Sequence, residues 1–316
     1  MIKPTKTVII TGANSGLGYE CAKRIARTSP DYHIVIAGRS AERIERAAQS
    51  LAGETGVNRF TPVQLNLASL DSVRKFAEQW PQLGLPPLHG LICNAGVQYS
   101  GHIEQSEDGY EATFAVNYLG HFLLTNSLVE YMARNARIIV LSSITHDDQA
   151  KTPLPKPVLK SAEALANPFP QAGESIAEFA GRAYSTSKLC ILMFAYELER
   201  RLSASGREDI AVNAFDPGGM LTGMTREWKP AARWMMKALW PLLRLAPNAS
   251  TPRNSAKVLA EMAVSERYRG ISGKFYSMIG SYRQGAREKQ TSAVSYDKRQ
   301  AQELWEGSER LIEARK

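Results

Sequence analysis

The chain has 316 residues, of which 44% are hydrophobic and 22% charged, a composition that supports a large buried core and excludes extended disorder. The net charge of +8 is uneven: residues 1–199 have 18 basic and 19 acidic side chains, whereas residues 200–316 have 21 and 12. A basic C-terminal third suits an anionic substrate, a nucleic acid or a membrane surface. The sequence has no zinc-finger spacing and no aromatic RNP motif, so we expect no nucleic-acid partner.

The cysteines and histidines argue against disulfides and bound metal. Cys21, Cys93 and Cys190 stand far apart and form no CxxC pair, which suits a reducing compartment. The five histidines form no HExxH motif, so we expect no metal site. Residues 1–6 lack the apolar stretch of a secretory signal, and no 18-residue window is apolar enough to span a membrane. These features predict a cytoplasmic protein.

The first half of the chain alternates short apolar runs with helical patterns. Strands are predicted at 7–10, 33–37, 60–65, 88–93 and 137–141, and helices at 19–26, 41–51, 69–80 and 109–132. Strands that are apolar throughout indicate a parallel sheet with both faces covered. The predicted fold is therefore α/β with a doubly wound, Rossmann-like parallel sheet, in one domain (1–316) whose dinucleotide-binding core spans 5–145.

The pattern changes after Ser143. Residues 151–173 contain five prolines and little periodicity, so we interpret 146–181 as a Pro-rich surface insertion. This insertion either borders the mouth of the substrate site or is an inert loop. A catalytic helix and a substrate-binding region are predicted to occupy 182–316. Within them we expect helices at 182–202, 256–263 and 297–313, strands at 210–215 and 273–277, and an apolar segment with spaced cations at 222–245.

A glycine-rich turn, Thr11–Gly18, follows the first predicted strand and opens the first helix. Glycines at this place let the backbone approach a pyrophosphate, and the helix N-terminus supplies amide donors and a favourable dipole. The alternative is a tight turn without a ligand. The position of the turn in a doubly wound sheet favours a dinucleotide site.

The spacing TGxxxGxG resembles that of the short-chain dehydrogenase/reductase family, and further motifs of the family follow in order. They are Asn94-Ala95-Gly96, Asn117, Ser143, the YxxxK pair of Tyr184 and Lys188, Pro217-Gly218, and Thr222. The resemblance covers nearly the whole chain. It implies that the cofactor is bound by Gly12, Asn14, Ser15, Gly16, Leu17, Gly18, Asn66, Leu67, Asn94, Ala95, Gly96, Tyr184, Lys188, Pro217, Gly218 and Thr222.

Tyr184 and Lys188 are four residues apart on a predicted helix and so share one face. A free phenol has a pKa near ~10, and a nearby ammonium, together with the positive nicotinamide ring of an oxidised cofactor, favours the phenolate. Tyr184 is therefore the candidate proton donor and acceptor. In the family pattern Ser143, rather than Ser142, holds the substrate oxygen, and Asn117 steadies a water beside the lysine.

The second predicted strand ends at Gly38-Arg39-Ser40 and has no carboxylate there to hydrogen-bond the ribose hydroxyls of NAD. Arg39 can make charge-assisted hydrogen bonds to a 2′-phosphate, so the expected cofactor is NADPH/NADP+. The alternative is an arginine that faces solvent. Asn66 stands where many relatives have an aspartate near the adenine, which weakens one expected contact.

Details around Asn117, Lys188 and Tyr296 resemble the retinol dehydrogenase-like and protochlorophyllide reductase-like branch of the family. The resemblance implies hydride transfer between NADPH and a carbonyl or alcohol of an apolar substrate. One alternative is light-dependent C=C reduction of the protochlorophyllide reductase type, and another is a non-catalytic dinucleotide-binding scaffold or sensor. Cys190 matches a substrate-pocket cysteine of protochlorophyllide reductases, although a small buried core residue is the competing interpretation.

The segment 228–245 follows the position of the family's substrate loop and is predicted to form a lid, with Trp228 as a candidate substrate contact. Lys229, Arg233 and Lys237 recur every four residues beside tryptophans, which suits peripheral contact with an anionic membrane. The alternative is an ordinary lid whose apolar side packs on the protein. Homo-oligomerisation, which occurs in many relatives, is also left open.

Overall fold

A computed structural model of the chain describes residues 3–220, 249–278 and 285–315. Within them lies a central sheet made of β1 (Lys6–Thr11), β2 (Tyr32–Gly38), β3 (Phe60–Gln64), β4 (Leu88–Cys93), β5 (Met132–Leu141), β6 (Ala211–Asp216), β7 (Phe275–Ser277) and β8 (Arg287–Lys289). The strand order is β3-β2-β1-β4-β5-β6-β7-β8. All neighbours are parallel except β7 and β8, which pair antiparallel.

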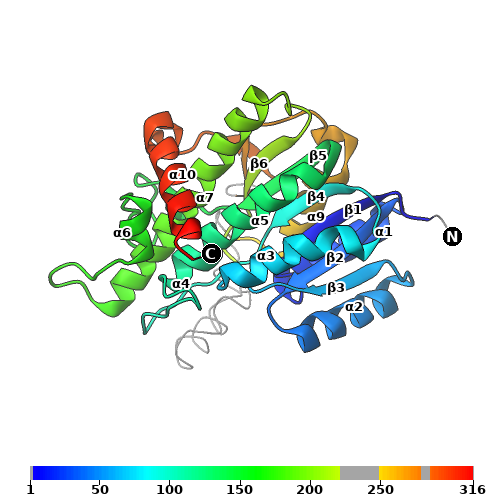
Figure 1. The fold of residues 1–316 in the computed structure, drawn as a ribbon, viewed down its shortest axis with the longest axis horizontal. Coiled ribbons are helices and arrows are strands. Elements are labelled where there is room, and N and C mark those ends of the chain that lie inside the picture. Colours follow the sequence, from blue (N-terminus) through cyan, green and yellow to red (C-terminus); the bar gives the residue numbers. More distant parts are fainter. Residues whose placement is uncertain (1–2, 221–248, 279–284, 316) are drawn as a thin grey trace.

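Helices cover both faces of this sheet (Figure 1). They are α1 (Gly16–Thr28), α2 (Ala41–Thr55), α3 (Leu70–Gln79), α4 (Ala112–Phe114), α5 (Gly120–Leu128), α6 (Ala162–Ala166), α7 (Ile176–Ala204), α9 (Pro252–Val264) and α10 (Lys298–Glu313). One hydrophobic core joins the sheet to α1, α2 and α9, and the other joins it to α3, α5 and α7 and includes buried residues of α6 and α10. The predicted doubly wound sheet in a single domain is confirmed.

The local sequence explains where several of these elements begin. β1 and β4 are apolar and buried on both faces, as strands in the middle of a parallel sheet must be. The side chains of Ser40 and Ser69 cap α2 and α3, because their oxygens accept hydrogen bonds from first-turn amides. Ser175 and Glu178 form a reciprocal capping box at the start of α7.

The predicted helix at 109–132 consists of four helical pieces. After α4 comes a π-helical turn at Ala115–Leu119, then α5, and a 3₁₀ turn at Val129–Tyr131 leads directly into β5. The tight packing of Gly120 accompanies the change of helix type: a Cβ there would lie 2.5 Å from the carbonyl oxygen of Leu67. Hydrophobic periodicity does not report such packing against a neighbouring loop.

The Pro-rich insertion is more ordered than predicted. Within it α6 buries Ala162 and Ala166 and packs against α10, and α7 begins at Ile176 rather than at 182. The small alanine side chains let α6 lie close to α10. The helix was not predicted because five residues are too few to show a hydrophobic periodicity. β8 was also not predicted, because its residues Arg287–Lys289 are charged and lie at the edge of the sheet.

The topology brings the predicted site motifs to the same end of the sheet, at the carboxyl ends of its parallel strands. β1 lies between β2 and β4. After β1 the chain continues to β2 and β3 on one side of it, and then crosses to β4 and β5 on the other side. In open α/β sheets this switch point leaves a crevice at the carboxyl ends of the strands. Among the described residues, no helix is long and apolar enough to cross a membrane.

Candidate active site

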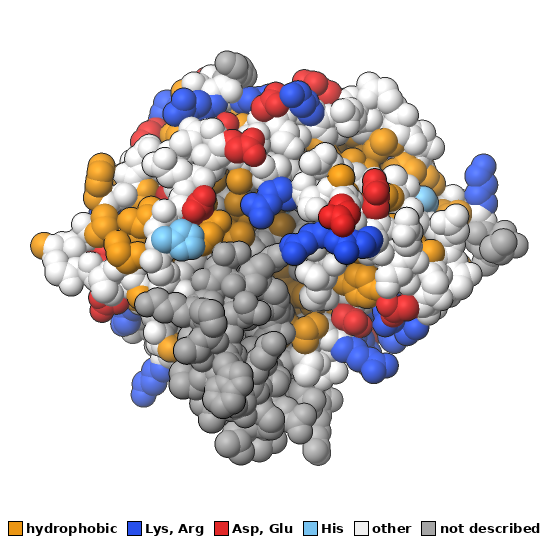
Figure 2. All heavy atoms as spheres, turned by 90° about the horizontal axis from the view of Figure 1, so that it is seen from below, with side chains coloured by type: hydrophobic (Ala, Val, Ile, Leu, Met, Phe, Trp, Pro, Cys, Tyr) orange, Lys and Arg blue, Asp and Glu red, His pale blue; other side chains and the backbone are white. Residues whose placement is uncertain are grey.

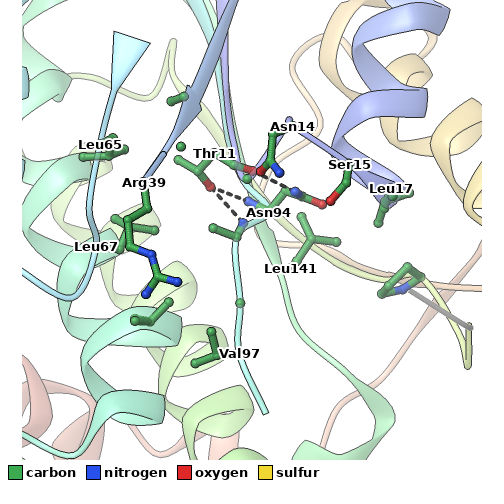
Figure 3. A pocket seen from close by; sticks show the side chains of 18 of the residues that line it. Thr11, Asn14, Ser15, Leu17, Arg39, Leu65, Leu67, Asn94, Val97 and Leu141 are labelled. Carbon is green, nitrogen blue, oxygen red and sulfur yellow. Dashed lines mark hydrogen bonds between the residues drawn. The ribbon is translucent and has the colours of Figure 1, made fainter. Parts of the chain in front are cut away.

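A cavity lies at the carboxyl ends of β1, β2, β4 and β5, where Figure 3 shows the surrounding side chains. Most of the residues predicted to bind a cofactor line it: Gly12, Asn14, Ser15, Gly16, Leu17, Arg39, Asn66, Leu67, Asn94, Ala95, Gly96, Tyr184, Lys188 and Pro217. These residues come from segments that are far apart in the sequence. The structure therefore brings the glycine-rich turn and the YxxxK pair to the same cavity.

The glycine-rich turn is built from backbone conformations and close approaches that favour glycine. Gly12 and Gly16 have φ values of +66° and +61°. Gly18 does not line the cavity, but a Cβ there would lie 2.6 Å from Nδ2 of Asn94. The third glycine therefore allows α1 to pack against the end of β4.

Thr11 ties the turn to the Asn94-Ala95-Gly96 segment (Figure 3). Its hydroxyl oxygen accepts hydrogen bonds from the backbone amides of Asn94 and Ala95, both at 2.9 Å. The side-chain amide of Asn94 donates to the carbonyl oxygen of Thr11 at 2.7 Å. Residue type and spacing predict no role for Thr11 or for His121, whose ring lies 3.0 Å from the Thr11 hydroxyl. These contacts hold two cavity-lining segments together.

The start of α1 has the features of an anion site. The side chain of its N-cap residue, Ser15, makes no capping hydrogen bond, in contrast to the serine caps of α2, α3 and α7. Amide groups of the first helical turn otherwise need a partner. Together with the glycines of the turn, they fit the pyrophosphate of a dinucleotide.

Two polar residues stand at the ends of β2 and β3. Arg39 is exposed at the cavity, and Figure 3 shows its guanidinium beside Leu67. Asn66 is half-buried, and its side-chain amide is held by the backbone of Ala68 and by Glu107. The cavity therefore presents a cation at the place where the sequence predicts a 2′-phosphate.

Tyr184 and Lys188 are both buried on α7. The Lys188 ammonium donates to the carbonyl oxygen of Leu141 at 2.9 Å and lies 5.6 Å from the centre of the Tyr184 ring. Burial lowers the pKa of Lys188 to about 8, against the opposing effect of the negative charge of Asp216. Burial raises the pKa of Tyr184, and Asp216 adds to this effect, whereas a hydrogen bond with Ser143 opposes it. The chain alone thus holds Tyr184 as a neutral phenol and does not itself favour the phenolate.

The two serines after β5 have different surroundings. The Ser142 hydroxyl is buried and donates to the backbone carbonyl of Lys188 at 2.9 Å, which ties β5 to α7. Ser143 is half-buried and forms the hydrogen bond with Tyr184. Ser142 thus has a structural bond, and Ser143 is the serine beside the tyrosine. Ser142, and not Ser143, is part of the cavity lining itself.

Asn117 lies in the π-helical turn, a local irregularity that is common at functional sites. Its amide nitrogen donates to the Val97 carbonyl and to the Ser187 hydroxyl, both at 3.0 Å, and its oxygen accepts from the Val97 amide at 2.8 Å. A Cβ on Gly96 would lie 3.2 Å from the Asn117 oxygen and 3.7 Å from the Lys188 nitrogen. The side chains of Asn117 and Lys188 therefore both lie close to Gly96.

Asp216, at the end of β6, was not predicted as a site residue. Burial raises the pKa of its carboxyl, whereas hydrogen bonds from the Gly218 amide and the Ser277 hydroxyl oppose the shift. Its charge acts on both Tyr184 and Lys188. Its position directly before Pro217-Gly218 was the only sequence signal available.

Some predicted site residues do not reach the cavity. Cys190 is fully buried in the hydrophobic core, because two residues along a helix is about 200° around its axis from Lys188. Cys190 therefore does not line the described cavity, its burial fits the competing interpretation of a core residue, and its role as a substrate contact stays a prediction. Gly218 has a φ of +76° and bonds to Asp216 but does not line the cavity. Thr222, Trp228 and the predicted lid 228–245 lie outside the described residues.

The fold and this arrangement of motifs define a class, the short-chain dehydrogenase/reductase oxidoreductases, and the chain belongs to that family. A sequence profile described as short chain dehydrogenase matches residues 6–152. The chain is 36% identical to the WW domain-containing oxidoreductase of Danio rerio over 98% of this chain and 69% of that protein.

Two further relatives place the chain in the retinol dehydrogenase-like branch. It is 34% identical to retinol dehydrogenase 13 of Homo sapiens, over 98% of this chain and 85% of that protein. It is 33% identical to the polyprenol dehydrogenase of Danio rerio, over 97% and 86%. Among solved structures, an uncharacterized protein from Mycobacterium Paratuberculosis shares 27% identity with a TM-score of 0.72, covering 98% of this chain and 94% of that chain. The branch suggested by the sequence motifs is thereby confirmed.

Proposed function

We propose that this protein is an NADPH-dependent oxidoreductase that transfers hydride between the nicotinamide and a carbonyl or alcohol group of an apolar substrate. The observation that carries the proposal is that Tyr184 and Lys188 line the same cavity as the glycine-rich turn and Arg39. A binding scaffold needs the turn but has no need of a buried tyrosine–lysine pair. The intact pair therefore favours an enzyme.

The dinucleotide supplies the hydride, and the residues of the chain supply the proton and the positioning. Tyr184, which burial keeps protonated, donates its phenolic proton to the carbonyl oxygen during reduction. Ser143, hydrogen-bonded to Tyr184, holds the same substrate oxygen. Lys188, with a pKa lowered to about 8, replaces the lost proton near neutral pH. Asn117 orders the region next to the lysine through its bonds to Val97.

Arg39 selects the phosphorylated cofactor. It stands exposed at the end of β2 and lines the cavity, so its guanidinium can pair with a 2′-phosphate through charge-assisted hydrogen bonds. A carboxylate at the same place would select the unphosphorylated ribose instead. The turn from Gly12 to Leu17 and the uncapped start of α1 hold the pyrophosphate.

The substrate class follows from the relatives. Two of them are named as dehydrogenases of retinol and of polyprenol, which are both alcohols on long hydrocarbon chains. The test is the loss of NADPH absorbance by the purified protein against a panel of aldehydes and ketones that includes retinal. Turnover of apolar aldehydes with NADPH supports the proposal. Binding of NADPH without turnover of any carbonyl favours a scaffold, and turnover of protochlorophyllide only in light favours C=C reduction.

A long apolar substrate would enter the cavity most easily from a membrane surface. Figure 2 shows separate hydrophobic patches on one face of the molecule, with Lys and Arg side chains between them. The sequence of 228–245 places cations beside tryptophans. Co-sedimentation with anionic and neutral liposomes tests this part, with Lys229, Arg233 and Lys237 changed to Glu as the comparison. If both proteins pellet equally and negligibly with anionic vesicles, the proposed membrane contact is wrong.

A further inference from the structure

Asn66 and Glu107 form a polar pair at one end of the cavity. Asn66 lines the cavity where β3 ends, and its Nδ2 atom donates to the Oε1 atom of Glu107 at 2.7 Å. Glu107 comes from the loop after β4, about 40 residues further along the chain. A carboxylate therefore lies one hydrogen bond away from the lining of the cavity.

The orientation of the Asn66 amide is set by two partners. Its Oδ1 accepts from the backbone amide of Ala68 at 3.1 Å, and its Nδ2 faces the Glu107 carboxylate. The flipped orientation would place a carbonyl oxygen against a carboxylate and an NH₂ group against an N–H donor, so both bonds would be lost. Asn66 thus acts as a donor toward Glu107 and fixes the position of that carboxylate.

The loop that carries Glu107 is also attached to the chain after β3. The Glu107 amide donates to the carbonyl oxygen of Ala68 at 2.8 Å, and the Leu70 amide donates to Oδ2 of Asp108 at 2.9 Å. Among the described residues, no hydrogen bond or ion pair involves the Oε2 atom of Glu107. The side chain is exposed, so this oxygen is available to a ligand.

The neighbouring cavity wall suits a flat aromatic ring. Leu65 and Leu67 are buried side chains at the end of β3, and the half-buried Val116 lines the cavity as well. Apolar walls with one polar group at the rim are the usual environment of a bound base, because the rings stack on apolar surface and their edges need hydrogen bonds. A carboxylate can only accept hydrogen bonds at neutral pH, so its complement is an N–H donor on the edge of the ring, which in adenine is the 6-amino group.

We infer that the Glu107 carboxylate, positioned by Asn66, accepts a hydrogen bond from the 6-amino group of the adenine of the cofactor and so makes this chain prefer adenine over a purine that lacks the 6-amino group. The inference rests on the proposed function, because it concerns the same dinucleotide site. Asn66 is neutral and cannot act as a charged acceptor. Glu107, from the loop after β4, takes that role.

The test compares two dinucleotides that differ at this one group. Isothermal titration calorimetry gives the dissociation constants of NADPH and of the reduced nicotinamide purine dinucleotide phosphate, in which a hydrogen replaces the 6-amino group. The proteins are the wild type, Glu107→Gln, and the matched control Glu104→Gln, which neutralises an exposed carboxylate of the same loop. Glutamine can still accept the bond from Asn66, so the fold is retained.

We expect the wild type and Glu104→Gln to bind NADPH at least about fivefold more tightly than the analogue, and Glu107→Gln to reduce this ratio to within about twofold. The double variant Asn66→Asp/Glu107→Gln returns a carboxylate to the pair and restores the preference. A wild-type ratio near one, or an unchanged ratio in Glu107→Gln, overturns the assignment while NADPH binding stands. Failure of the wild type to bind either dinucleotide contradicts the proposed cofactor and the assignment together.

Discussion

The two walls of the cavity are built in different ways. The wall formed by the ends of β1 and β4 consists of backbone and short side chains, held by the hydrogen bonds between Thr11 and Asn94. The wall formed by α7 and the end of β6 places three buried ionisable groups, Tyr184, Lys188 and Asp216, near one another, and the charge of Asp216 raises the pKa of the other two. The first wall has the shape to bind a dinucleotide, and the second has the groups that can transfer protons.

This difference separates the effects expected of mutations. Changes in the β1–β4 wall should alter cofactor affinity or the stability of the fold, because that wall works through shape and neutral hydrogen bonds. Changes in the α7 wall should alter turnover and its pH dependence, because its groups exchange protons. The following predictions test whether the two walls can be separated in this way.

The largest effect is expected from Tyr184→Phe. It removes the phenolic proton donor and keeps the ring, so turnover should fall by roughly 10²–10⁴-fold. NADPH affinity, measured by calorimetry, should stay within a few-fold of the wild type. Tyr196→Phe is the matched control on the same helix, because the Tyr196 hydroxyl bonds to Thr291 and does not line the cavity. Nearly normal turnover in Tyr184→Phe would remove Tyr184 from the mechanism.

The next largest effect is expected from Arg39→Asp at the end of β2. The change replaces an attractive charge by a repulsive one at the expected 2′-phosphate, so the preference for NADPH over NADH should fall by about 10–100-fold. Turnover rates at saturating cofactor should change little. Steady-state kinetics with both cofactors measure the preference, with Arg46→Asp as the control because Arg46 is exposed on α2 outside the cavity lining. A wild type that already prefers NADH would show that Arg39 has another role.

Gly18→Ala should destabilise the β1–β4 wall by about 1–3 kcal/mol, because overpacking a tight contact forces the neighbours to move. The added methyl would lie 2.6 Å from the Asn94 side chain and 3.0 Å from the backbone of Ala13. Gly53→Ala in α2 meets no atom within 4 Å and should stabilise the protein by about 0.5–1 kcal/mol. Urea denaturation of both variants measures the two free energies of unfolding. Equal stability of the two variants would contradict the close packing at Gly18.

The smallest predicted effect is a shift in the pH profile of Asp216→Asn. The ionised carboxylate raises the pKa of both Tyr184 and Lys188, so its removal should lower both pKa values. Tyr184 then loses its proton at lower pH, and the alkaline limb of the reductive kcat should move toward lower pH by less than about one unit. Asp71→Asn, an exposed change on α3, is the control. An unmoved limb would mean that Asp216 is not ionised in the site.

The sequence predicts the β1–β4 side of the molecule well for a physical reason. Its strands contain continuous apolar runs, such as Val8, Ile9 and Ile10 in β1, and glycines with positive φ, such as Gly12, are required locally by the turn. Both signals depend on short stretches of chain. The boundaries of β1, β2 and β4 accordingly fall within one residue of those predicted.

The other side depends on contacts between distant segments, which a pattern of residue types does not reveal. The burial of α6 comes from its packing against α10, and the π-helical turn at Asn117 is followed by Gly120, which packs closely against Leu67. The influence of Asp216 on Tyr184 and Lys188 requires β6 to lie beside β5 and α7 to cover them. For Cys190 the family likeness suggests a substrate contact and the residue type suggests a buried core residue, and its place on the helix puts it in the core.

Hydride transfer from labelled cofactor tests the central claim most directly. NADPH carrying deuterium at C4 of the dihydronicotinamide is incubated with retinal and either the wild type or Tyr184→Phe, and mass spectrometry detects deuterium in the alcohol product. We predict labelled alcohol with the wild type and, in the same time, less than about one hundredth as much with Tyr184→Phe. Absence of label with the wild type, or equal labelling by both proteins, would contradict the account.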